Sequence, residues 1–151
     1  MQIIEYFTCD RPEFWLEQIK MSDWGAGKFL YELLSENKLK EAVGEKVKVL
    51  MLTEGDTLMS FCTYADKDDI QPTELTPWIG FVYTFPEHRG HRCMGELFAE
   101  IKRLAKTEQV QDIYISTNHV GLYEKYGCEF YQMMTDMSGE PSRVYKMHVD
   151  L

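Results

Sequence analysis

The chain has 151 residues, of which 44% are hydrophobic, and its formal net charge is −9 at pH 7. This length suits one domain with its own core, and the apolar content excludes a disordered chain. The negative charge disfavours nucleic acid and anionic membranes as partners, and no apolar run approaches the roughly 20 residues of a membrane span. We therefore expect a single globular domain over residues 1–151.

The first third of the chain predicts one strand and two helices. Residues 2–7 are expected to form a strand, and Asp10 with Pro12 is expected to begin a helix, with the aspartate as its cap. Residues 22–27 contain two glycines and predict a turn or mobile loop. A second helix is expected over residues 28–38, with its apolar side chains on one side.

The middle of the chain predicts three strands. Residues 47–53 and 57–64 flank the sequence E-G-D, which is typical of a hairpin turn. Residues 65–76 form a polar loop rich in acidic side chains. Residues 78–85 form the third strand, which is apolar enough to be buried on both faces.

The last third predicts a long helix, a short helix and three strands. Strands are expected over residues 112–117, 129–133 and 143–149, and a short helix over residues 120–126 is expected to end at Gly127. The long helix precedes them, and its apolar residues share one face: Met94, Leu97, Phe98, Ile101, Leu104 and Ala105.

The order of these elements predicts the fold class. A strand, a helix and a strand from residue 78 to residue 117 imply a parallel pair joined by a right-handed crossover, whereas the hairpins imply antiparallel pairs. We therefore expect an α/β (α+β) fold, with a mixed central sheet of about six to seven strands and about four helices on its two faces.

A basic loop lies between the apolar strand and the long helix. It holds two arginines and two glycines in the sequence E-H-R-G-H-R-C-M-G. The first N–H groups of a helix have no internal partners and the helix dipole is positive there, so such a junction binds anions. Arginine adds planar donors that suit phosphate. The loop therefore predicts a phosphorylated ligand, with a solvated basic turn as the alternative.

Two segments resemble the GNAT superfamily of acetyl-CoA-dependent N-acetyltransferases. The sequence V-Y-T-F-P-E-H-R-G-H-R-C-M-G-E-L-F is similar to the family's strand, P-E-x-R-G turn and cofactor helix, and L-Y-E-K-Y-G is similar to its late helix and following turn. The predicted order of elements also fits the family. The resemblance implies a GNAT-like domain that transfers an acetyl group from acetyl-CoA to a primary amine, by direct attack in a ternary complex.

The resemblance also implies where acetyl-CoA binds. Backbone groups around Thr84 and Phe85 would pair with the pantetheine amides and polarise the thioester, while Asn118 would bond the pantetheine or cap the short helix. Arg92 and Met94 stand where small residues are usual, which crowds the approach of the pyrophosphate. The loop that would hold the pyrophosphate consists of Arg89, Gly90, His91, Arg92, Cys93, Met94 and Gly95.

The resemblance implies one catalytic residue and leaves the other open. Tyr123 corresponds to the tyrosine of the L-Y-E-K motif and would be the general acid, because an ordinary tyrosine pKa of about 10 lies above that of a thiol. A core tyrosine is the alternative. We take Glu74 as the candidate general base, in an acidic loop that would attract a cationic amine. The other carboxylates of that loop are also open for this role: Asp66, Asp68 and Asp69.

Other interpretations of the sequence remain open. The crowded loop and the unidentified base suggest a non-catalytic acyl-CoA-binding sensor or interaction domain, and the anion site alone would suit a nucleotide-binding module. A covalent route through Cys93 lacks a base partner. The acceptor is expected to be a small-molecule or peptide amine that is cationic, and homodimers are common in the family that the chain resembles.

No metal is expected, because the four histidines lack the spacing of metal ligands. The four scattered cysteines contain no C-x-x-C pair, and the chain starts without the basic region of a signal peptide. This pattern favours a reducing compartment and predicts a cytoplasmic protein.

Overall fold

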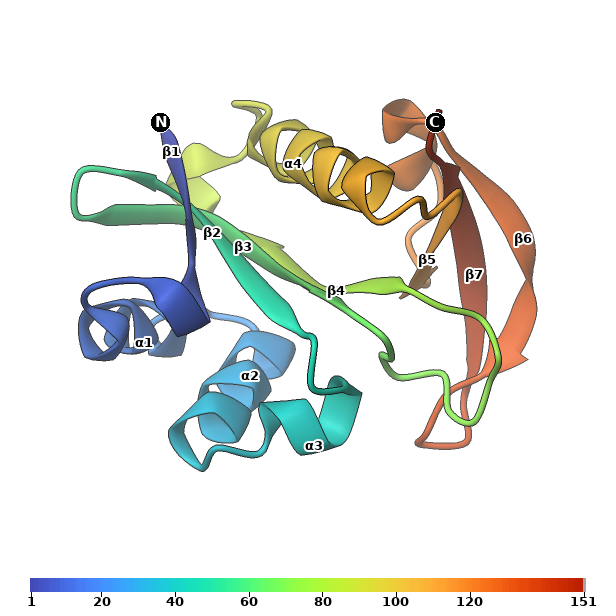
Figure 1. Ribbon diagram of the computed structural model, residues 1–151, viewed down its shortest axis with the longest axis horizontal. Helices are drawn as coiled ribbons and strands as arrows, with labels where there is room; N and C mark the ends of the chain where they lie inside the picture. Colours follow the sequence, from blue (N-terminus) through green and yellow to red (C-terminus); the bar gives the residue numbers. More distant parts are fainter. Residues whose placement is uncertain (151) are drawn as a thin grey trace.

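In the computed structural model, which describes residues 1–150, a seven-stranded sheet lies between two layers of helices (Figure 1). The strands are β1 (Gln2–Glu5), β2 (Lys48–Glu54), β3 (Thr57–Ala65), β4 (Trp78–Thr84), β5 (Asp112–Thr117), β6 (Cys128–Thr135) and β7 (Pro141–His148). The α-helices are α1 (Pro12–Lys20), α2 (Gly25–Ser35), α3 (Leu39–Val43) and α4 (Cys93–Thr107). Short 3-10 turns are η1 (Tyr6–Thr8), η2 (Pro86–His88) and η3 (Tyr123–Tyr126).

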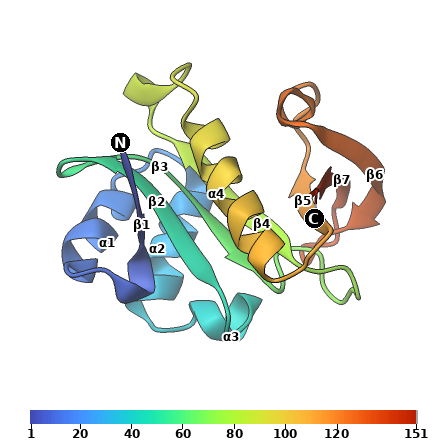
Figure 2. The same cartoon turned by 45° about the horizontal axis from the view of Figure 1, so that its top comes forward.

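The strands follow the order β1-β2-β3-β4-β5-β7-β6. Every neighbouring pair is antiparallel except β4 and β5, which are parallel and joined through α4. The expected mixed sheet and its parallel pair are therefore confirmed. Helices α1, α2 and α3 cover one face and α4 covers the other (Figures 1 and 2). Among residues 1–150, none of the helices has the length and apolar character that crossing a bilayer requires.

The two faces of the sheet support separate hydrophobic cores. Leu97, Phe98 and Ile101 point from α4 into one core, which we call the α4-side core. Trp15 from α1 and Leu30 from α2 belong to the other, the α1–α2-side core. The apolar period of α4 predicts this burial correctly, because residues three and four apart lie on one helical face.

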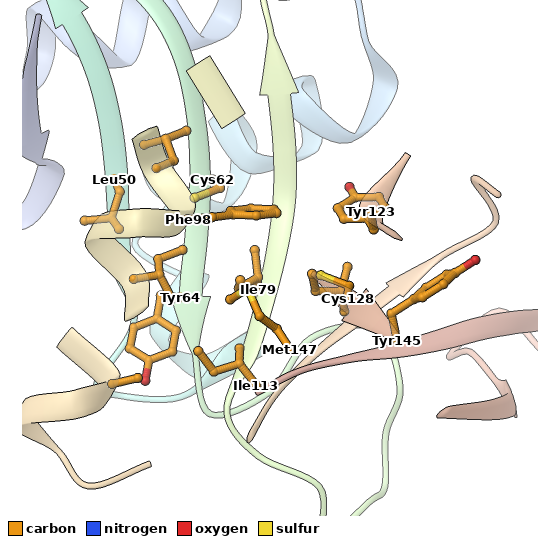
Figure 3. Close-up of a cluster of buried hydrophobic side chains, with 14 of the residues drawn as sticks. Leu50, Cys62, Tyr64, Ile79, Phe98, Ile113, Tyr123, Cys128, Tyr145 and Met147 are labelled. Carbon is orange, nitrogen blue, oxygen red and sulfur yellow. The ribbon is translucent and has the colours of Figure 1, made fainter. Parts of the chain in front are cut away.

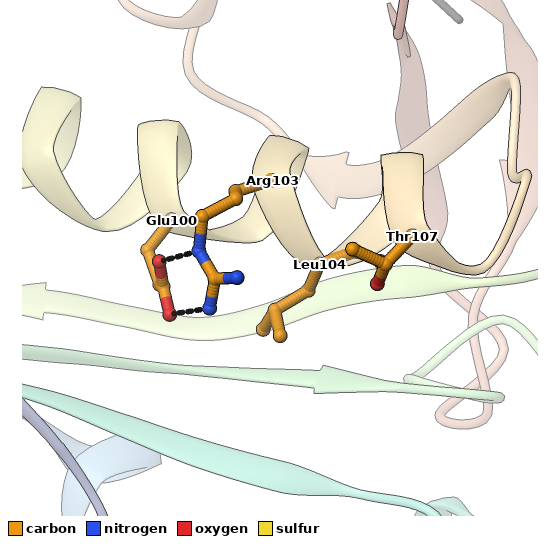
Figure 4. A network of polar contacts seen from close by, with 4 residues as sticks. All are labelled: Glu100, Arg103, Leu104 and Thr107. Carbon is orange, nitrogen blue, oxygen red and sulfur yellow. Dashed lines mark hydrogen bonds and ion pairs between the residues drawn. The ribbon is translucent and has the colours of Figure 1, made fainter.

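The solvent face of α4 carries polar pairs close to the helix backbone (Figure 4). Arg103 Nε donates to Glu100 Oε1 at 2.7 Å, and Thr107 Oγ1 donates to the carbonyl of Leu104 at 2.6 Å. Exposed ion pairs of this kind add at most about 1 kcal/mol, so the apolar face holds α4 in place.

The start of α1 and the limits of α2 differ from expectation. Arg11, not Asp10, is the N-cap residue of α1, and no side chain caps the helix. Helix α2 begins at Gly25, so the loop expected over residues 22–27 is wrong in its second half. A Cβ atom on Gly27 would lie 2.2 Å from Ser22 Oγ, so this glycine permits close packing at the start of the helix. The short helix expected over residues 120–126 is only the 3-10 turn η3.

Strands β4 and β5 separate after a short contact. Only Trp78 with Tyr114 and Ile79 with Ile115 are paired in register, so residues 80–84 have no strand partner on the β5 side within the described part of the chain. Phe81 adopts a φ of 50°, next to a register shift between β3 and β4. Phe81, Val82 and Thr84 are only partly buried, whereas Tyr83 is buried, so the expectation that this strand is buried on both faces is wrong for part of its second half.

Candidate active site

A cavity of about 720 Å³ opens where β4 and β5 separate, and we call it the central cavity. Val82 and Leu122 line it and also pack against the α4-side core. Trp24 and Tyr83 line it too, and both belong to the α1–α2-side core. The cavity therefore reaches both faces of the sheet.

The basic loop forms one end of the central cavity. Six residues of the predicted cofactor set line it: Thr84, Arg89, Gly90, Arg92, Cys93 and Met94. Arg92 is the N-cap residue of α4 with a φ of 62°, and its side chain does not cap the helix. A non-glycine residue in this left-handed conformation costs about 1 kcal/mol or more, which accounts for small residues being usual at such a position. The first N–H groups of α4 are thus left for an anion.

Arg89 is held at the edge of this loop. Its Nε donates to the carbonyl of Thr84 at 3.0 Å, and its guanidinium carbon lies 5.7 Å from the centre of the Tyr83 ring. Both contacts fix the guanidinium plane beside the cavity. The terminal nitrogens keep their donors for an anionic ligand.

The other predicted cofactor residues lie around the central cavity without lining it. Phe85 lines a neighbouring cavity of about 390 Å³, and His91 is exposed. A Cβ atom on Gly95 would lie 3.4 Å from the Tyr126 ring, so this glycine packs against η3. Asn118 Oδ1 accepts a long hydrogen bond of 3.4 Å from the backbone of Arg143.

Tyr123 is buried at the end of the α4-side core, with 5% of its surface exposed. Its ring lies between Phe98 and Tyr145, at centroid distances of 6.1 and 6.3 Å (Figure 3). Burial raises the pKa of Tyr123, and negative charge on Cys62, Cys128 and Asp68 would raise it further. The phenol is therefore protonated at neutral pH.

Two acidic side chains of the β3–β4 loop, Glu74 and Asp68, differ in burial. Glu74 is exposed. Asp68 is half-buried, and its Oδ1 atom would lie 2.0 Å from a Cβ atom added to Gly80 of β4. The carboxyl therefore fills the space that a side chain at Gly80 would need. Burial, followed by the charge of Asp69, raises the pKa of Asp68 to about 7.

Sequence reasoning missed the pair of Asp23 and Tyr83. The Tyr83 hydroxyl donates to the Asp23 carboxylate and accepts from the Asp23 backbone N–H at 3.2 Å. The Trp24 ring stacks on Tyr83 at 5.7 Å. These partners are about 60 positions apart in sequence, and no local motif joins them.

Replacing Asp68 by asparagine is expected to raise the free energy of unfolding at pH 8 by about 4 kcal/mol. The folded-state pKa of about 7 lies above the ordinary value of 3.8, so the wild type loses stability as pH rises from about 4 to 7. The asparagine amide carries no charge at any of these pH values, so the variant does not lose this stability as pH rises. Urea unfolding at pH 4 and pH 8 measures the difference, which should be small at pH 4. Equal gains at both pH values, or an equal gain in Asp66→Asn, would contradict the explanation.

Comparison with known proteins gives a consistent result. A model of the acetyltransferase (GNAT) family matches residues 5–131. Among solved structures, the aminoglycoside 6'-N-acetyltransferase from Enterococcus faecium superposes with a TM-score of 0.70 at 12% identity, over 100% of this chain and 98% of that one. No curated protein matches the chain by sequence.

Two further solved structures contain a bound cofactor. A GNAT family acetyltransferase from Elizabethkingia anophelis with acetyl-CoA bound has a TM-score of 0.64 at 11% identity, over 98% of this chain and 97% of that one. An aminoglycoside 6'-N-acetyltransferase complexed with coenzyme A has a TM-score of 0.69 at 9% identity, over 100% of this chain and 98% of that one. At these identities the likeness shows the shared fold.

Proposed function

The chain belongs to the acetyltransferase (GNAT) family, and from this membership we propose that it moves the acetyl group of acetyl-CoA to a primary amine by direct attack in a ternary complex. The observation that carries the proposal is the central cavity, which has the basic loop at one end and reaches both faces of the sheet. A cavity of this form lets a donor and an acceptor meet inside the molecule.

We propose that acetyl-CoA lies along the unpaired side of β4. Residues 80–84 have no strand partner there, so an extended pantetheine arm would pair with backbone groups as an added strand does, including those near Thr84 and Phe85. The pyrophosphate would rest on the loop from Arg89 to Gly95, with His91 at its exposed edge. The bulge at Phe81 would bring the thioester to the level where the sheet opens.

We propose Tyr123 as the general acid and keep Asn118 as a contact to the pantetheine arm. Attack by the amine forms the C–N bond and breaks the C–S bond, and the leaving thiolate takes the phenol proton. The α4-side position of Tyr123, beside Leu122 of the cavity wall, supports this role.

We propose a small cationic amine as the acceptor. The solved structures named as aminoglycoside acetyltransferases favour a small-molecule amine as the acceptor. The net charge of −9 and the carboxylate of Asp23 beside the cavity favour a cation. Peptide amines are the second class to test, and a homodimer, which is common in the family, stays a prediction.

Replacing Arg89 by alanine is expected to weaken acetyl-CoA binding by about 10- to 100-fold, because one charge-assisted hydrogen bond to phosphate is worth about 1.5–3 kcal/mol. Calorimetric titration measures the Kd for acetyl-CoA, and desulfo-CoA should bind similarly while ATP binds more weakly. Arg103→Ala, on the exposed face of α4, is the matched control and should leave the Kd unchanged.

A second variant separates charge from loop geometry. Arg92→Gly keeps the left-handed conformation at the N-cap and removes the side chain together with its backbone strain, so any loss of affinity is attributable to the missing Arg92 guanidinium. Failure of the wild type to bind acetyl-CoA at millimolar concentration would refute the proposed function.

A further inference from the structure

The backbone around Asp68 is fixed by contacts with two other parts of the chain. Gln71 Nε2 donates to the Asp68 carbonyl at 2.8 Å and to the Ala42 carbonyl of α3 at 3.1 Å. The backbone N–H of Met137, in the β6–β7 turn, donates to the Asp69 carbonyl at 2.9 Å. The Asp68 side chain therefore projects from an anchored segment.

The Asp68 carboxyl packs against Gly80, the one glycine of β4. Ile79 belongs to the α4-side core, and successive strand residues point to opposite faces, so Gly80 faces the α1–α2 side. Phe81 belongs to the core on that side, and its ring lies 6.3 Å from the Phe29 ring of α2. The carboxyl of Asp68 thus lies on the α1–α2 face, at the first residue of β4 beyond its pairing with β5.

Tyr123 belongs to the core on the opposite face of the sheet, and the carboxyl of Asp68 is near enough to influence its pKa. A proton donor and a carboxylate therefore lie near each other, on opposite faces of the sheet, with the carboxyl at the residue where β4 leaves β5. We propose that Asp68, seated on Gly80, accepts the proton of the acceptor amine in the acetyl transfer. This inference rests on the proposed function.

The proposed step balances in protons and electrons. The acceptor ammonium gives one proton to the Asp68 carboxylate, and the freed lone pair on nitrogen attacks the thioester carbon. The C–N bond forms, the C–S bond breaks, and sulfur leaves with its electron pair and takes the phenol proton of Tyr123. The second proton on nitrogen restores that phenol, and Asp68 releases its proton to solvent, so one proton is produced per acetyl group transferred.

The surroundings of Asp68 suit a proton acceptor near neutral pH. Asp69 on the same loop is the charged group that acts on Asp68, Asp136 in the β6–β7 turn acts on Asp69, and Asp68 itself acts on Tyr123. Burial and Asp69 raise the pKa of Asp68 to about 7, so the group can both take up and release a proton. Activity should therefore rise with pH through about 7, as the carboxylate form appears.

Asp68→Asn tests the inference, because the amide has the shape of the carboxyl and accepts no proton. We would measure kcat/KM between pH 6 and pH 10 with acetyl-CoA and three probe acceptors: spermidine, kanamycin and a lysine-containing peptide. The variant should lose about 10²- to 10³-fold at pH 7 and recover as pH approaches the pKa of the amine. Its Kd for acetyl-CoA should match that of the wild type.

Two further variants sharpen the test. Gly80→Ala places a methyl group where the carboxyl sits and should cause a similar loss at pH 7 with acetyl-CoA binding retained. Glu41→Gln removes an exposed charge from neighbouring α3 and should change nothing.

The outcomes separate the inference from the proposed function. A wild type that binds acetyl-CoA and acetylates none of the probes refutes the function, and the inference with it. An active wild type with Asp68→Asn equally active at pH 7 refutes only the inference. If Asp68→Asn fails to fold, the wild-type profile decides: a fall in activity below about pH 7 supports the inference, and a flat profile from pH 6 to 8 overturns it.

Discussion

Replacing Tyr123 by phenylalanine is expected to lower kcat for acetyl transfer by about 10²- to 10⁴-fold while leaving the Kd for acetyl-CoA within about twofold. The substitution removes one hydroxyl from a ring packed between Phe98 and Tyr145, so the packing survives and the leaving thiolate loses its proton donor. Release of coenzyme A thiol measures kcat, and calorimetry measures the Kd.

A second buried tyrosine is the matched control for this variant. The Tyr64 hydroxyl lies in the same core and donates to Glu108 Oε1 at 2.9 Å, remote from the central cavity. Tyr64→Phe should therefore keep its kcat. If Tyr123→Phe also kept its kcat, Tyr123 would be a packing residue and another group would protonate the thiolate.

Replacing Phe98 by alanine is expected to reduce the free energy of unfolding by about 3–5 kcal/mol. Phe98 is 2% exposed on α4, and its ring contacts both Tyr123 and Tyr126 at centroid distances of 6.1 and 5.6 Å. The loss includes the transfer of the ring and the cavity left beside the two tyrosines. Urea unfolding measures it, and the midpoint should fall with an unchanged slope.

Phe98→Leu separates volume from aromatic contact. Leucine fills most of the space, so it should cost less stability than alanine while still removing the stack on Tyr123. If alanine cost less than 1 kcal/mol, the α4-side core would have to repack around the vacancy, contrary to the close packing found there.

The elements that the sequence predicts well are those with strong local patterns. The hairpin between β2 and β3 and the apolar face of α4 follow from turn chemistry and helical period, which depend on neighbours within a few residues. The predicted start of α2 was wrong because Gly25 and Gly27 favour a loop by propensity. In the structure Gly27 lies inside the helix, where its packing against Ser22 requires a small residue.

The features of the candidate site also divide into those that local sequence predicts and those that depend on distant contacts. The basic loop is predictable, because its charges and glycines are adjacent in sequence. The opening between β4 and β5 depends on where two distant strands stop pairing, and the burial of Asp68 depends on a contact with Gly80 across a loop. The available signal was Gly80 itself, since a glycine inside an apolar strand marks a close approach or a bulge. Without that contact, Glu74 and Asp68 are equivalent carboxylates, and Glu74 remains an untested candidate.

The central cavity has lining residues on both faces of the sheet, so the residues on one face can change in evolution independently of those on the other. Under the proposed function, acetyl-CoA and its acceptor would enter from opposite faces of the sheet, so neither would block the other and either order of arrival is sterically open. On one side the lining residues belong to the start of α4 and the loop before it, and on the other side Asp23 and Trp24 belong to the segment between α1 and α2. Under the same proposal, selection can change the acceptor by altering the segment between α1 and α2, while the loop proposed to hold the acetyl donor stays unchanged.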